Sequence, residues 1–132
     1  MPRKSFATQA VVSGVFAGAA ILMSGFAAYA ASPLGQWARA DGISRVKISN
    51  CGNKICATNT WVRPDIEKEK VGDVLEMSIS PKGVDGYSGS AFDPQRNMTF
   101  SMTLKLKDDR MTTSGCVLGG ILCRSVMWRK VD

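Results

Sequence analysis

The strongest constraint on the fold lies near the end of the chain, where the pair Gly119-Gly120 separates two short apolar runs. Glycine accepts the positive φ that both central positions of a two-residue hairpin turn require. The final nineteen residues therefore predict an antiparallel hairpin. With the turn centred on the glycines, the residues that face each other are Leu118 and Ile121, Val117 and Leu122, and Cys116 and Cys123.

The four cysteines predict two disulfides. Directly opposed residues of an antiparallel pair lie within reach of a disulfide, which favours Cys116–Cys123. Cys51 and Cys56 flank a four-residue loop. Four cysteines allow three pairings, and we favour the two local ones because each pair lies across a tight turn. The alternatives are weaker, since C-x6-C is wide for a zinc knuckle and the C-x-x-C of a redox pair is absent. Two disulfides indicate an oxidising compartment.

The first thirty residues have the pattern of a secretory signal. Arg3 and Lys4 precede the apolar run 10–26, and Ala28-Tyr29-Ala30 matches a small-x-small cleavage site. We expect residues 1–30 to be a signal peptide cleaved after Ala30, and 31–132 to be one periplasmic or secreted domain. An uncleaved membrane anchor is the alternative, because the apolar run is nearly long enough to span a bilayer. Its alanine and glycine content favours cleavage, which would leave no stable anchor.

The remainder of the chain alternates between apolar and polar residues. In Met98–Lys107 every second residue is apolar, which is typical of a strand with one buried face. Eight such short runs in series predict an all-β fold, a small eight-stranded antiparallel up-and-down barrel; a two-sheet sandwich is the alternative. Besides the closing hairpin, the other expected strands are 35–40, 45–50, 54–62, 74–80, 87–92 and 111–118.

The residue types argue against an enzyme. The chain has no histidine, which excludes a Ser-His-Asp triad, a Cys-His dyad and an imidazole metal site. Asp65, Glu67 and Glu69 alternate with lysines in a polar loop, where a solvated surface is the simplest interpretation. We expect no catalytic residues, no metal and no cofactor. The formal charge is +6, but the basic residues occur singly along the sequence, which argues against a nucleic-acid surface.

Two motifs resemble known families. Gly35-Gln-Trp37 is similar to the G-x-W signature of lipocalin-type barrels, in which an arginine from the last strand covers the tryptophan. This resemblance implies a lipocalin-like barrel. An antiparallel last strand would end beside the start of the first, so we expect a stack between Trp37 and Arg129.

The wider pattern resembles the exported bacterial family DUF2147, whose function is unassigned. The matching motifs are G-x-W, 51-CGNKIC-56 leading into Trp61, 92-FDP-94, 115-GC-116, and 122-LCR-124 leading into 128-WRKV-131. The chain departs from the family around 87–91, which is smaller and more polar. The resemblance supports fold and export and implies no activity.

These features favour a non-enzymatic binding module of the cell envelope that holds a small apolar molecule inside the barrel. The expected pocket wall consists of Trp61, Met77, Phe100 and Met102, which lie on apolar strand faces. The alternative is an envelope protein–protein interaction or inhibitor-type module that acts through the long loop 63–72. A lysozyme inhibitor is disfavoured, because lysozymes are usually basic and this chain is basic too.

Overall fold

The structure is a computed structural model that describes residues 14–15, 17–19 and 31–131. Apart from 14–15 and 17–19, the predicted signal peptide, including its basic start and the cleavage site at Ala30, lies outside the described residues. The described part of the chain contains no helix with the length and hydropathy of a membrane span.

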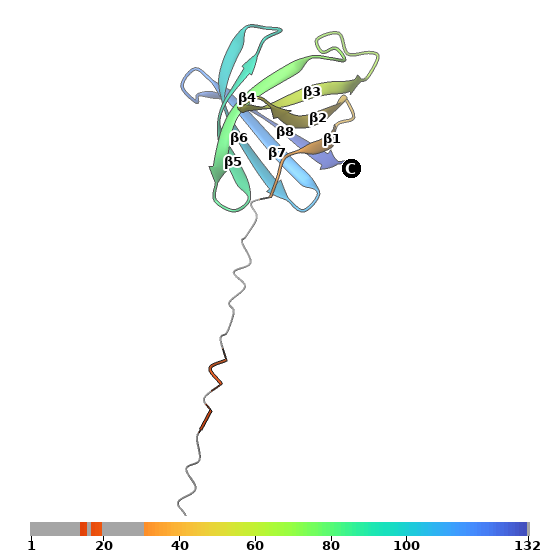
Figure 1. Cartoon of the computed structure of the whole chain (residues 1–132). Coiled ribbons are helices and arrows are strands. Elements are labelled where there is room, and N and C mark those ends of the chain that lie inside the picture. Colours follow the sequence, from red (N-terminus) through yellow and green to blue (C-terminus); the bar gives the residue numbers. More distant parts are fainter. Residues whose placement is uncertain (1–13, 16, 20–30, 132) are drawn as a thin grey trace, which may run out of the picture.

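Eight antiparallel strands form a closed barrel, with each strand hydrogen-bonded to its neighbours in chain order and β8 paired with β1 (Figure 1). This arrangement confirms the predicted up-and-down barrel, and the two-sheet sandwich was wrong. The strands are β1 Gly35–Arg39, β2 Ser44–Cys51, β3 Lys54–Val62, β4 Val74–Lys82, β5 Gly86–Asp93, β6 Met98–Lys107, β7 Arg110–Val117 and β8 Leu122–Lys130.

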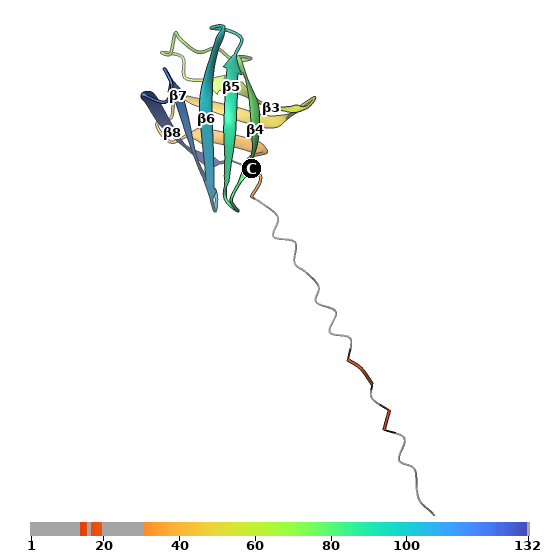
Figure 2. The same ribbon diagram turned by 90° about the vertical axis from the view of Figure 1, so that its left-hand side faces the viewer.

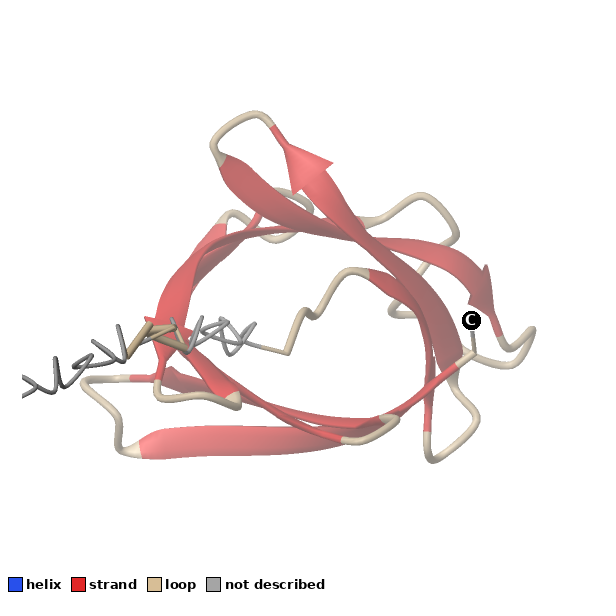
Figure 3. Ribbon diagram, turned by 60° about the horizontal axis from the view of Figure 1, so that its bottom comes forward, coloured by secondary structure: helices blue, strands red, loops and turns tan. Residues whose placement is uncertain are grey.

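The two ends of the barrel differ in their connections. One end, called the closed end here, carries the short turns 52–53, 83–85 and 108–109 together with the segment that precedes β1. Figure 3 looks toward this end and shows the segment entering the ring of strands. Pro33 is buried there, and its carbonyl accepts a hydrogen bond of 2.8 Å from Trp37 Nε1. The opposite end, called the mouth here, carries the loops 40–43, 63–73, 94–97 and 118–121.

The core follows from the two-residue period of the strands. In β6, Met102, Leu104 and Leu106 are buried while the residues between them are exposed, as the alternation predicted. Burying one such side chain stabilises the fold by about 1.5–3 kcal/mol. The buried apolar core consists of Trp37, Val46, Ile48, Met77, Ala91, Met102, Leu104, Leu106 and Met111.

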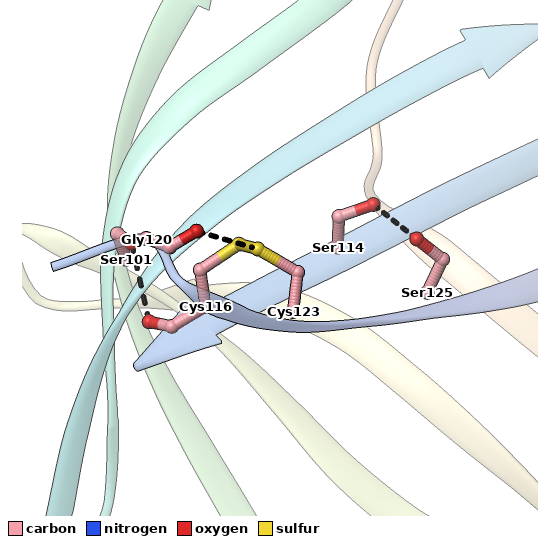
Figure 4. Close-up of a disulfide and its surroundings, with 6 residues drawn as sticks. All are labelled: Ser101, Ser114, Cys116, Gly120, Cys123 and Ser125. Carbon is pink, nitrogen blue, oxygen red and sulfur yellow. Dashed lines mark hydrogen bonds between the residues drawn. A yellow bond between two sulfur atoms is a disulfide. The ribbon is translucent and has the colours of Figure 1, made fainter. Parts of the chain in front are cut away.

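Both local disulfides are present, Cys51–Cys56 at the closed end and Cys116–Cys123 near the mouth. The closing hairpin has the predicted register, and Gly119 and Gly120 both adopt positive φ, 68° and 90°. Figure 4 shows the second disulfide with the hydroxyl contact beside it, in which Ser114 Oγ and Ser125 Oγ lie 2.7 Å apart. The outer face of this hairpin is therefore tied together at two successive levels.

The backbone of β4 leaves no room for a side chain at Gly89 of β5. A Cβ atom at this position would lie 2.1 Å from the carbonyl oxygen of Ser78, a backbone atom that cannot move independently of its strand. Figure 2 shows β4 and β5 side by side along their length. The absence of a side chain at Gly89 therefore allows this pair of strands to form.

We predict that Gly89→Ala lowers the free energy of unfolding by about 1–3 kcal/mol, the usual effect of forced overpacking. Urea unfolding followed by circular dichroism measures the change. The matched control is Ser90→Ala, an exposed neighbour on the same strand, which should stay within about 0.5 kcal/mol of the parent protein. Equal stability of the two variants would contradict the close approach.

Candidate ligand cavity and its mouth

The barrel encloses a cavity of about 230 Å³ that opens toward the mouth. Its inner wall is apolar because the inward positions of β2, β4 and β6 are filled by aliphatic, methionine and aromatic side chains. Toward the mouth the lining becomes polar and charged. The lining residues on the apolar side are Val46, Ile48, Ala57, Val74, Leu75, Met77, Phe100, Met102, Leu104, Met111 and Trp128, and on the polar side Asn59, Glu69, Asp73, Asp93, Gln95, Arg96 and Thr113.

Three of the four predicted pocket residues, Met77, Phe100 and Met102, line this cavity. The prediction for Trp61 was wrong. This ring is 43% exposed and lies on the outer surface, with the guanidinium carbon of Arg45 5.8 Å from its centroid.

A β-bulge explains the error at Trp61. Val46 pairs with Asn59, but the residue that precedes it on β2, Arg45, pairs with Trp61. Strand β3 therefore contains one extra residue, at Thr60. An extra residue in one strand shifts the alternation of every residue beyond it. The simple pattern placed Trp61 on the inner face with Asn59, and the bulge turns it outward.

The predicted stack of Arg129 on Trp37 was also wrong, by one residue. Trp37 pairs with Lys130, and Arg129 pairs with Ala38 and points outward from the barrel. The Lys130 ammonium nitrogen lies 5.8 Å from the centroid of the Trp37 ring. A cation from the last strand therefore does cover this tryptophan, but a lysine supplies it.

The long β3–β4 loop, residues 63–73, is held against the mouth by hydrogen bonds to its backbone. Asn59 Nδ2 donates to the carbonyl of Lys70 at 3.3 Å, and Asn59 N donates to the carbonyl of Asp73 at 2.9 Å. From the β5–β6 turn, Arg96 Nη2 donates to the carbonyl of Lys68 at 2.6 Å. The loop 63–72, the contact surface of the alternative hypothesis, thus also forms part of the wall of the mouth.

Asp93 organises the polar side of the mouth. Its carboxylate accepts hydrogen bonds from Arg96 Nη1 and from Gln95 Nε2, both at 2.7 Å, and from the backbone nitrogens of the same two residues. Burial alone would raise the pKa of Asp93, but the bonds from Arg96 and Gln95 outweigh it, so the pKa lies below its usual value. Gln95 also bonds the backbone of Val74, which connects the turn to β4.

A second, more open groove adjoins the cavity and is bordered by β6, β7 and β8. Its volume is about 590 Å³, and it shares Glu69, Leu75, Phe100, Met102, Thr113 and Trp128 with the cavity. Arg39 lies at its edge, with Nη1 3.8 Å from Glu69 Oε2. The remaining lining residues are Met98, Ser114, Gly115, Val117, Leu122, Cys123, Arg124 and Val126.

Trp128 is the one tryptophan in the cavity wall, and the pocket predicted from the sequence did not include it. Its indole Nε1 donates to Thr113 Oγ1 at 3.0 Å, and Arg39 Cζ lies 6.0 Å from the ring centroid. The signal was available, because the register fixed by Cys116 and Cys123 places Trp128 opposite Met111. Asp93 appeared in the sequence analysis only within the motif 92-FDP-94, and nothing in the sequence showed that Gln95 and Arg96 would connect it to β4 and to the long loop.

The described residues contain no group of three or more His, Cys, Asp or Glu side chains that could hold a metal ion. The geometry offers a partly enclosed apolar space with a charged entrance. These features define a class, the small closed β-barrels with an internal cavity, here with two local disulfides.

The chain belongs to the family described as "Uncharacterized protein conserved in bacteria (DUF2147)", whose model matches residues 35–130. Among solved structures, the chain is similar to a redesigned β-barrel with 14% sequence identity and a TM-score of 0.49, covering 75% of this chain and 90% of that one. No curated protein matches. The family is bacterial, and the two disulfides are typical of a protein outside the reducing cytoplasm.

We predict that Asp93→Asn lowers the free energy of unfolding at neutral pH by about 1–2 kcal/mol, because the charge-assisted bond to Arg96 is lost. A carboxyl group whose pKa is lowered in the folded state stabilises the fold above its unfolded pKa of about 3.9, and this contribution disappears as the pH falls through the folded pKa. The parent protein should therefore lose more stability than the variant below about pH 4.

Urea unfolding between neutral and acid pH measures this difference. Asp85→Asn is the matched control, since Asp85 is exposed in a turn at the closed end. Parallel stability curves for the parent and the Asp93→Asn variant would show that the charge of Asp93 does not support the mouth.

Proposed function

We propose that this protein is an exported, non-enzymatic binding module of the bacterial cell envelope that holds a small, largely apolar molecule in the barrel. The observation that carries the proposal is the apolar cavity, which the side chains of the core leave unfilled. A closed barrel of eight strands is wide enough either to be filled by side chains or to hold one small ligand.

The volumes favour a ligand larger than a simple solvent molecule. An apolar cavity of about 150 Å³ can bind benzene, and drug-sized ligands occupy pockets of about 300–1,000 Å³. The cavity of about 230 Å³ alone suits a fragment, whereas the adjoining groove of about 590 Å³ accommodates a longer molecule. An elongated ligand such as a lipid fragment fits both spaces better than a compact one.

The chemistry of the walls favours a ligand with one apolar and one polar end. Met77 and Met102 supply flexible, polarisable side chains that adapt to irregular apolar shapes. At the mouth, Gln95, Arg96 and Glu69 offer donors and acceptors. The apolar end would lie between β4 and β6, and the polar end would rest at the mouth.

Export is part of the same proposal. The sequence pattern of residues 1–30 is that of a signal peptide with cleavage after Ala30, and the disulfides suit an oxidising compartment such as the periplasm. Native mass spectrometry of protein purified from the periplasm without detergent tests both parts. We expect the mass of residues 31–132 with two closed disulfides, and an additional non-covalent mass from the ligand.

We predict that Ala57→Phe, which places a ring inside the cavity, weakens binding of the co-purifying molecule or of an apolar fluorescent probe by at least about ten-fold, or 1.4 kcal/mol. The reason is steric, since Ala57 lines the cavity. Tryptophan fluorescence, to which Trp128 in the cavity wall contributes, follows the titration.

The matched control is Thr58→Phe, the adjacent position on the outer face of β3, which should bind as the parent protein does. Both variants must show the parent's near-ultraviolet circular dichroism. Unchanged binding in the correctly folded Ala57→Phe variant would place the ligand outside the barrel and overturn the proposal.

A further inference from the structure

The strand register gathers basic residues that are separate in the sequence into one row on the outer surface of the barrel. Lys107 pairs with Arg110, and Arg110 pairs with Arg129. Where β8 pairs with β1, Arg129 lies opposite Ala38, which in turn pairs with Arg45 on β2. All four cations are exposed. Figure 1 shows β7, β8, β1 and β2 side by side.

Two further cations extend this row into a basic face. Lys105 lies two residues before Lys107 on β6, and Lys47 lies two residues after Arg45 on β2, so both point outward as well. The basic face is defined here as Lys47, Arg45, Arg129, Arg110, Lys107 and Lys105.

No acidic residue belongs to the six adjacent strands from β6 through β8 and β1 to β3, as their sequences show. Among the described residues, no salt bridge involves a member of the basic face. Asp108 and Asp109, in the turn between β6 and β7, lie beside one end of the row, as does Asp85, whose backbone carbonyl accepts a hydrogen bond from Leu106 N. The face therefore carries a concentrated positive charge that the fold does not neutralise by ion pairs.

This arrangement is unfavourable for the isolated protein. Like charges directly opposite each other on neighbouring strands destabilise a sheet, and the row contains two such pairs in succession, Lys107–Arg110 and Arg110–Arg129. An anionic surface would remove this repulsion, so binding to it gains both the new attraction and the relief of the old repulsion.

The exposed uncharged neighbours of the row indicate which kind of anionic surface fits. Met127, two residues before Arg129 on the same face of β8, is 54% exposed. Trp61, which pairs with Arg45 at the end of the row, is 43% exposed. Single-stranded nucleic acid would require several free aromatic rings for base stacking, whereas Trp61 already stacks with Arg45. The headgroup region of a bilayer accepts tryptophan, apolar side chains and cations together.

We propose that the basic face docks this protein on the surface of a bilayer that contains anionic phospholipid. A plane that touches the barrel at β8 meets Arg129, with Arg110 on one side and Arg45 on the other. The long side chains of lysine and arginine extend toward that plane from the flanking strands. This inference concerns the outer surface and does not depend on the cavity holding a ligand.

The test is flotation of the protein, expressed from the full-length sequence and purified without detergent, with vesicles of phosphatidylcholine alone or mixed with phosphatidylglycerol. We expect binding to the mixed vesicles only, and a decrease as the salt concentration rises. Each basic residue at such a surface contributes about five-fold to the partition coefficient, so Arg110→Gln/Arg129→Gln should weaken binding by roughly 30-fold.

The matched control is Lys68→Gln/Lys82→Gln, which removes the same charge from exposed positions outside the face. It should bind nearly as the parent protein does. Because the parent and both variants have the same N-terminal residues, that segment does not contribute to a difference in binding between them. Thermal unfolding should show the Arg110→Gln/Arg129→Gln variant folded and at least as stable as the parent, because a repulsive pair is gone.

Three results would overturn the proposal. The first is the absence of vesicle binding, or equal binding to both vesicle types. The second is equal weakening by the two double variants, which would show that only net charge matters. The third is tighter binding to a single-stranded oligonucleotide than to anionic vesicles at the same salt concentration, which would assign the basic face to a nucleic acid.

Discussion

The pairing of β8 with β1 is the interaction on which the rest of the structure depends. It converts a chain of hairpins into a closed barrel, which leaves no strand edge unpaired and gives every strand an inner and an outer face. The junction is short, with three residue pairs between the two strands. On the inner face of this junction, Lys130 pairs with Trp37 and lies over its ring. Arg39 pairs with Trp128 and lies over that ring. The ring closure and the packing of these tryptophans therefore support each other.

Once the ring is closed, one register controls two unrelated surfaces. The inward positions combine into an apolar core that stops short of the mouth, where Asp93, Gln95 and Arg96 tie the β5–β6 turn to β4 and to the long loop. The outward positions combine residues from strands that are distant in sequence. A shift of β2, β6, β7 or β8 by one residue would exchange the inward and outward sets of that strand and turn its exposed cations toward the core. The cavity and the basic face are thus consequences of the same hydrogen-bond pattern.

The sequence predicted the features that depend on local information. The Gly119-Gly120 turn, the two short-range disulfides and the alternation of β6 each lie within one or two adjacent strands, so a pattern of neighbouring residues suffices. The errors arose where the answer depends on register between strands. The bulge in β3 opposite Arg45 turns Trp61 outward. The register between β8 and β1 places Lys130, and not Arg129, opposite Trp37.

The same limitation affected the charge distribution. Arg45, Lys107, Arg110 and Arg129 are scattered along the sequence, which argued against a nucleic-acid surface. Only the pairing of five strands shows that these residues share one level of the barrel. Scattered charge in a β protein is therefore weak evidence against a charged face, because side chains that share a level come from different strands.

The short span of both disulfides has a consequence for the synthesis of this protein. The partners are separated by 5 and 7 residues, so each thiol finds its partner within one hairpin. Hairpins form in microseconds, far faster than thiols oxidise, so a newly synthesised chain can select the correct pairs before the ring closes. Long-range mispairing would require the more distant cysteines to meet first. Oxidative folding can therefore proceed in the order in which the chain emerges, with little need for disulfide isomerisation.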